Sequence, residues 1–273
     1  MSTNMMYTAI AGLNTFNDAL GVVSDNIANS NTTGFKSNTV DFGDLVAGLM
    51  TTDSVNTTTE GVGSQIIGTT SDFTNGNEIQ TSVWSNLMIE GNGFFCVQNS
   101  AAENFYTRDG SFEVDSKGFL TDMQGNYVLG YPISSTGAVS TTAGQIQTWN
   151  TATTAPYASY NIDQFGVLTG TDTSGNVTKI AQLEVDTFNN PNGLIRDGAN
   201  KYTPGTSAGS PITGTAGTGQ AGKIISGALE GSNVDLTEQM VDLITYQADY
   251  QANSKSISTG STLLQTVLSL IQG

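Results

Sequence analysis

The sequence has 273 residues, enough for two or three compact units with an ordinary hydrophobic core. Its formal net charge is -16, from 8 Lys and Arg against 24 Asp and Glu, so its surface repels phosphate backbones and nucleic-acid binding is not expected. It contains no histidine, the commonest general base and metal ligand near neutral pH, and its single cysteine excludes an internal disulfide.

Near the start of the chain, apolar residues recur at alternating steps of three and four, the pattern of a coiled-coil seam. No basic segment followed by an apolar core and a cleavage site precedes this pattern, so we expect no cleaved signal peptide. No run of 18 apolar residues occurs either, so we expect no membrane insertion. The residues of the predicted seam are Met6, Ala9, Leu13, Phe16, Leu20, Val23 and Ile27.

The middle of the chain changes from helical to alternating periodicity, with turn signals about every eight residues. Residues 32–88 are predicted to form a linker or extended β segment, and residues 89–231 a β-rich outer domain. Residues 133–159 are rich in Thr, Ser, Gly and Ala, which indicates loops or weak strands. Cys96 lies in an apolar run and is expected to be a buried strand residue rather than a reactive thiol.

At the other end, one row of side chains repeats every seven residues over 36 residues, which predicts a long helix. Residues 232–235 indicate a helix cap. The carboxylates of Glu230, Asp235, Glu238 and Asp242 are interpreted as capping and solvated groups, not as a paired catalytic site. Residues 1–31 and 232–273 together form the predicted terminal helical domain. The seven-residue row consists of Leu236, Leu243, Tyr250, Ile257, Leu264 and Ile271.

Several motifs suggest chemistry that their context does not support. Residues 217–222 match G-x-G-x-x-G, but a loop precedes them and a predicted strand follows, whereas a dinucleotide site needs a strand and then a helix. Ser207 lies in a G-x-S-x-G match, yet no histidine is present to serve as its base. Asp163, Asp172 and Asp186 do not have the spacing of a calcium loop. We therefore expect no catalytic residue, no cofactor and no metal.

Three stretches, in order along the chain, resemble the flagellar axial proteins, the family of rod and hook subunits. The first is residues 20–36, LGVVSDNIANSNTTGFK, which is very similar to the signature of that family. The second comprises residues 89–95 and 106–110. The third comprises residues 227–236 and 250–255. Together the three stretches extend over most of the chain.

The resemblance implies a structural protein, not an enzyme, that assembles with many copies of itself into a helical tube. Its implied neighbours are the distal rod and hook–filament junction proteins, with the hook cap and the type III export apparatus as partners during assembly. It further implies an extracellular place in the flagellum, in the hook or the basal-body rod, after export without a cleaved signal peptide. The implied role is a flexible joint that transmits torque from rod to filament.

Residues 187–194 and 250–255 resemble hook subunits more than rod subunits. Hook subunits usually carry an inserted outer domain, however, and residues 133–159 are too few for one, so a distal rod (drive-shaft) subunit is the alternative. A secreted adhesin is a third hypothesis, in which the β middle binds a ligand and the helices only anchor it. The predicted fold class is α+β, with long N- and C-terminal α-helices pairing in a coiled-coil-like layer and a mainly antiparallel β middle domain.

Overall fold

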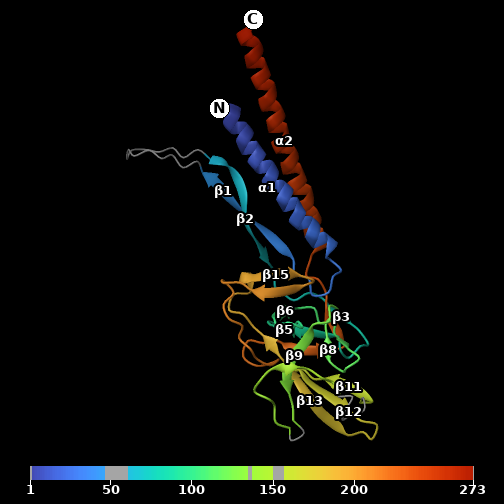
Figure 1. Ribbon diagram of the computed structural model, residues 1–273. Helices are drawn as coiled ribbons and strands as arrows, with labels where there is room; N and C mark the ends of the chain where they lie inside the picture. Colours follow the sequence, from blue (N-terminus) through green and yellow to red (C-terminus); the bar gives the residue numbers. More distant parts are fainter. Residues whose placement is uncertain (1, 47–60, 135–136, 150–156, 273) are drawn as a thin grey trace, which may run out of the picture. The chain divides into compact units, whose positions relative to one another are not determined.

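The computed structural model describes residues 2–46, 61–134, 137–149 and 157–272, and the chain divides into two compact units (Figure 1). Unit 1 consists of Met1–Ser30, Ser37–Asp72 and Val234–Gly273. Unit 2 consists of Asn31–Lys36 and Phe73–Asn233. The predicted linker over residues 32–88 is therefore shared: most of it belongs with the terminal helices, and its two ends belong with the β-rich unit.

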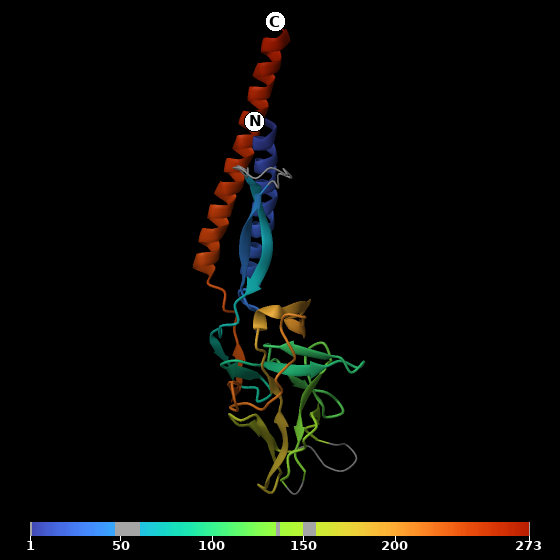
Figure 2. The same cartoon turned by 90° about the vertical axis from the view of Figure 1, so that its left-hand side faces the viewer.

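Unit 1 contains both predicted helices, α1 (Ser2–Ala28) and α2 (Leu236–Gln272). It also contains a long antiparallel hairpin of β1 (Asn38–Val46) and β2 (Gly61–Ser71). The hairpin lies along α1 (Figure 2). Neither helix in the described part of the chain combines the length and apolarity that a membrane crossing requires.

Unit 2 is built from short strands that pair antiparallel, which confirms the α+β class and the antiparallel middle. The largest sheet runs in the order β11-β12-β13-β9-β5-β6-β16-β15, with β7, β8, β10 and β14 paired at its sides. Two further pairs are β3 with β18 and β4 with β17. The strands are β3 (Glu78–Gln80), β4 (Leu87–Glu90), β5 (Phe94–Gln98), β6 (Asn104–Thr107), β7 (Glu113–Val114), β8 (Leu120–Thr121), β9 (Tyr127–Pro132), β10 (Gly144–Gln145), β11 (Ser159–Ile162), β12 (Val167–Thr171), β13 (Val177–Leu183), β14 (Val185–Asp186), β15 (Leu194–Gly198), β16 (Lys201–Pro204), β17 (Lys223–Ser226) and β18 (Ala228–Glu230), with a short 3-10 helix, η1, at Pro191–Gly193.

Strand β5 lies between two hydrophobic clusters and is buried on both faces. Because successive side chains of a strand point to opposite faces, Phe95 and Val97 enter the larger cluster while Phe94 and Cys96 enter the smaller one. Cys96 is 1% exposed, as expected for a buried strand residue. Two-sided burial explains why this segment is continuously apolar rather than alternating.

Candidate functional site

The two terminal helices lie against each other in antiparallel orientation. A β-carbon added to Gly12 would lie 3.0 Å from the side chain of Asn253, and one added to Gly260 would lie 2.9 Å from Met5. At the other end of the pair, the amide nitrogen of Asn26 donates to Gln239 at 2.8 Å. Met5, Gly12 and Asn26 of α1 are seven and then fourteen positions apart. Their partners in α2, Gly260, Asn253 and Gln239, have the same spacing in the opposite chain direction. These three contacts therefore share one antiparallel register.

Small and polar residues take part in this contact at Gly12, Asn26, Gln239, Asn253 and Gly260, and small residues allow two helix axes to approach closely. Ala9 and Ala19 of α1 are 4% and 0% exposed. At one level an aromatic cluster takes their place: the ring of Phe16 lies 6.0 Å from Phe42 of β1 and 6.1 Å from Tyr246 of α2. The cluster joins both helices to the hairpin within unit 1.

The residues predicted to pack between subunits differ in their exposure. Val23 is fully buried, at 3% exposure. Leu236 and Tyr250 are exposed, at 43% and 39%. Ile271 lies outside the side chains that the structure describes. The other predicted packing residues are half-buried: Leu13, Phe16, Leu20, Ile27, Leu243, Ile257 and Leu264.

Helix α2 leaves many apolar side chains uncovered within unit 1. Gln272 lies twelve residues beyond Gly260, whereas Ser2 lies only three residues before Met5, so the last turns of α2 extend past α1 (Figure 2). An exposed apolar surface of this extent marks an interaction site. The large exposed apolar side chains of α2 are Leu236, Met240, Val241, Ile244, Tyr250, Leu263, Val267, Leu268 and Leu270.

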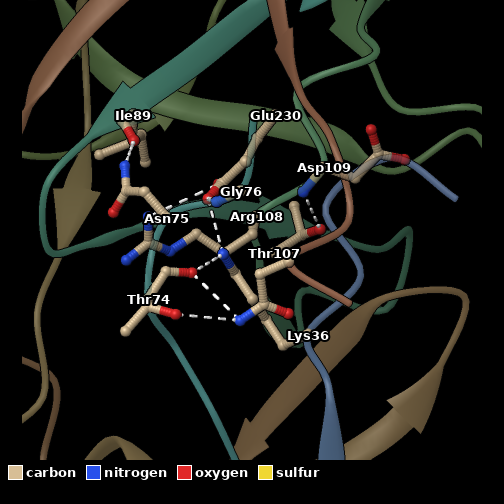
Figure 3. A network of polar contacts seen from close by, with 10 residues as sticks. Lys36, Thr74, Asn75, Gly76, Ile89, Thr107, Arg108, Asp109 and Glu230 are labelled. Carbon is tan, nitrogen blue, oxygen red and sulfur yellow. Dashed lines mark hydrogen bonds and ion pairs between the residues drawn. The ribbon is translucent and has the colours of Figure 1, made fainter. Parts of the chain in front are cut away.

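A buried ionic cluster lies in unit 2, where three separate stretches of the sequence meet (Figure 3). The Nζ atom of Lys36 lies 2.6 Å from Oε1 of Glu230, and both side chains are 0% exposed. Nη1 of Arg108 lies 3.6 Å from Oε2 of the same carboxylate. Lys36 also donates to the carbonyl of Thr74 at 2.6 Å, and the N–H of Gly76 donates to Oε1 of Glu230 at 3.1 Å.

This cluster corrects the interpretation of Glu230 as a solvated or capping group: it is 1% exposed and ion-paired. Asp235 does cap α2, since its Oδ1 accepts from the N–H of Thr237 at 2.8 Å. Burial lowers the pKa of Arg108, and Glu230 opposes that shift. The cluster could not be predicted from the sequence because Lys36, Arg108 and Glu230 are far apart in the chain. The available signal was that each lies inside one of the three stretches that resemble the axial proteins.

The backbone beside Lys36 depends on a glycine. Gly34 has φ +66, and a β-carbon there would lie 2.5 Å from the backbone nitrogen of Asp109. Its N–H donates to the carbonyl of Glu230 at 2.8 Å. Phe35 is 1% exposed and has the guanidinium of Arg196 over its ring at 5.1 Å. Residues 34–36 are thus held against the rest of unit 2 by three kinds of contact: the backbone of Gly34, the apolar ring of Phe35 and the charge of Lys36.

The motifs that suggested chemistry have structural positions. The glycine-rich residues 217–222 lead into strand β17, not a helix. Ser207 lies in a turn. Asp163 and Asp172 accept backbone N–H groups inside tight turns, and Asp186 is buried in β14. Among the described residues, no cluster of three metal-ligating side chains occurs.

Comparison with known proteins gives matches along most of the chain. The family models described as "Flagella basal body rod protein", "Flagellar hook protein FlgE/F/G D1 domain" and "Flagellar basal body rod FlgEFG protein C-terminal" match residues 6–36, 88–170 and 225–270. Each matched segment contains one charged residue of the buried cluster: Lys36, Arg108 and Glu230 respectively.

Curated relatives of both rod and hook type match nearly the whole chain. The flagellar basal-body rod protein FlgG of Bacillus subtilis is 31% identical over 274 residues, covering 97% of this chain and 98% of the relative. Its counterpart from Borreliella burgdorferi is 30% identical over 269 residues, covering 95% of each. The flagellar hook protein FlgE of Escherichia coli is 25% identical over 405 residues, covering 96% of this chain and 98% of the relative.

Proposed function

Because the chain belongs to the family of flagellar hook and rod proteins, which are structural parts of the flagellum and not enzymes, we propose that it is a hook subunit. It assembles with copies of itself into a helical tube. The tube is a flexible joint that transmits torque from the rod to the filament.

The observation that carries assembly is the uncovered apolar surface of α2. Ile244 is 64% exposed, Val267 52% and Leu270 77%. Transferring such side chains from water into a contact with another copy releases about 1.5–3 kcal/mol for each side chain that becomes fully buried. Contacts of this kind, made by both terminal helices, would complete the predicted coiled-coil-like layer, with Leu243, Ile257 and Leu264 packing on neighbouring copies as well as on α1.

Assignment to the hook rests on two segments that resemble hook subunits, residues 187–194 before and within β15 and residues 250–255 in α2. The rod is the second candidate, and chain length favours it. The two rod relatives align over 269 and 274 residues, whereas the alignment with the hook relative extends over 405 residues, against 273 in this chain. A hook subunit of this length lacks the extra region that the longer hook protein contains.

The mechanical role follows from how the two kinds of surface bind. Apolar helix contacts are cohesive and resist twist, because separating them exposes area to water. The sequence of unit 2 is rich in Thr, Ser and Asn, and exposed polar contacts are individually worth little, so neighbouring β units slide at low cost as the tube bends. In this proposal the distal rod and the hook–filament junction proteins bind the ends of the tube, and the chain reaches its extracellular place through the type III apparatus with a hook cap in position.

Electron microscopy of flagella from a deletion strain tests the assignment. Loss of a hook subunit should leave complete rods that end where the hook begins, whereas loss of a rod subunit should leave shortened rods. Purified full-length chain should form curved tubes, and a chain lacking residues 236–273 should form none. Tubes made by the truncated chain would refute the role of α2 in assembly.

A further inference from the structure

Unit 2 contains a cavity of about 190 Å3 that nothing in the assembly proposal uses. The rings of Phe94 and Phe188 form apolar walls, and Arg108 forms part of the lining. The amide side chains of Asn189 and Gln220, both exposed, lie at the cavity. Arg108 is the charged residue of this lining, and apolar and uncharged polar residues form the rest of it.

Arg108 has unused hydrogen-bonding capacity. Its side chain is 2% exposed, yet its Nε and Nη1 atoms donate no hydrogen bond in the described part of the chain. The carboxylate of Glu230 lies closer to Nζ of Lys36, at 2.6 Å, than to Nη1 of Arg108, at 3.6 Å. Nη1 faces Oε2 of Glu230, which also lacks a hydrogen bond, so the donor left without an acceptor is Nε–H. A buried donor without an acceptor is costly, and the N–H of a guanidinium donates well to a carboxylate oxygen.

We propose that this cavity binds a carboxylate group and that an acidic side chain of a second copy supplies it in the assembled polymer. The second step rests on the proposed function. Charge complementarity favours this occupant, because the chain carries 24 Asp and Glu against 8 Lys and Arg, so a neighbouring copy presents many carboxylates and few cations. The aromatic walls accommodate the apolar stem of the incoming side chain.

Phenylacetate tests the carboxylate chemistry on the full-length chain, at concentrations below assembly. Its ring suits the aromatic walls, and phenylacetamide is the neutral control of the same shape. Titration followed by the 15N shift of the Arg108 Nε–H should show phenylacetate binding at least about tenfold more tightly than phenylacetamide, because only the carboxylate forms an ion pair with the guanidinium. Equal binding of the two compounds, or no shift with either, overturns the proposal.

Exposed Gln220 offers a variant pair that spares Arg108, whose replacement could unfold the protein. Gln220→Glu places a competing carboxylate at the cavity and should weaken phenylacetate binding about tenfold more than Gln220→Ala, which removes the same amide without adding a charge. Equal weakening by the two variants would show that the charge at Gln220 is irrelevant and would count against a carboxylate site.

Assembled tubes identify the source of the carboxylate. If a second copy fills the cavity, phenylacetate should no longer shift Arg108 once the chain is polymerised. Binding to tubes as tight as to the single chain overturns the role of a second copy. A chain that forms no tubes refutes the proposed function instead, while the titration of the single chain still decides whether the cavity takes a carboxylate.

Discussion

Asn26 and Gln239 are 213 positions apart in the sequence, yet their side chains share a hydrogen bond of 2.8 Å. Asn26 is 1% exposed and makes two further bonds to the backbone of Asn38: its Nδ2 donates to the carbonyl at 2.8 Å, and its Oδ1 accepts from the N–H at 2.9 Å. One side chain thus connects α1 to both α2 and β1. Correct pairing of the two chain ends depends on this link.

Replacing Asn26 by Ala should destabilise unit 1 by about 2–4 kcal/mol, because it removes three hydrogen bonds and leaves buried partners unsatisfied. Urea unfolding followed by helical circular dichroism measures this change. Ser24→Ala is the matched control, since Ser24 is exposed and its hydroxyl donates to the carbonyl of Leu20 one turn earlier. Equal loss of stability in both variants would show that the Asn26 link does not hold the helices together.

Apolar periodicity located both helices to within a few residues, because a repeat of seven is a property of local sequence. One predicted seam residue, Phe16, does lie against Tyr246 of α2. The contact also uses Gly12, Asn26, Gln239, Asn253 and Gly260, which the apolar pattern did not indicate. A polar or small residue at an interface is recognisable only with its partner in view, and that partner lies more than two hundred residues away.

The buried ions escaped prediction for a related reason. Composition assigns charged residues to the surface, since they are rarely buried unless paired, and the sequence does not show pairing. Residues 32–88 were expected to be a linker or extended β segment, and the pairing of Asn38–Val46 with Gly61–Ser71 beside α1 depends on tertiary contact that the sequence does not show. The β middle and its turns followed from local Gly and Asp signals, and there the prediction of antiparallel strands was confirmed.

Lys36→Met should cost about 3–5 kcal/mol in unfolding free energy, because it leaves Glu230 buried with its closest cation removed. Denaturation of unit 2 followed by tryptophan fluorescence reports the change. Lys179→Met provides the control at an exposed strand position and should change stability by less than about 0.5 kcal/mol. A Lys36→Met protein as stable as this control would show that the ion pair contributes nothing.

Ala102→Gly should stabilise the protein by up to about 1 kcal/mol. Four turns share one design: an Asp at the first position accepts two N–H groups, and a glycine three residues later has φ between +76 and +87. The turn that starts at Asn99 repeats this pattern, but Ala102 stands in the place of the glycine, with φ 64. An alanine there is strained, and glycine relieves the strain.

The reverse change, from glycine to alanine in one of the other four turns, is the control for Ala102→Gly. Gly125 has φ +84, and a β-carbon there would meet nothing within 4 Å, so Gly125→Ala introduces backbone strain without a clash. It should destabilise the protein by about 1 kcal/mol. Thermal unfolding of the two variants should therefore move the melting temperature in opposite directions. A lower melting temperature for Ala102→Gly would contradict the strain argument.

Asp186 and Glu184 form a buried acidic pair beside Cys96. Asp186 is 1% exposed and Glu184 4%, and Oδ1 of Asp186 and Oε2 of Glu184 have no hydrogen-bond partner in the described part of the chain. Burial first, and then the charge of Glu184, raises the pKa of Asp186 to about 7. Burial also raises the pKa of Cys96, so its thiol stays protonated and donates to Asp186.

A raised carboxyl pKa makes the folded protein less stable as pH rises. Between the ordinary value of 3.8 and about 7, folded Asp186 holds a proton that the unfolded chain has lost, so stability falls over this window and not below it. The loss from pH 5 to pH 8 should be about 3 kcal/mol.

Asp186→Asn, which cannot ionise, should match the native chain at pH 5 and exceed its stability at pH 8 in urea unfolding. Asp197→Asn, at an exposed position, should change stability by less than about 0.5 kcal/mol at both pH values. An Asp186→Asn protein that loses as much stability as the native chain between pH 5 and pH 8 would place the proton elsewhere in the pair, on Glu184, whose pKa burial also raises.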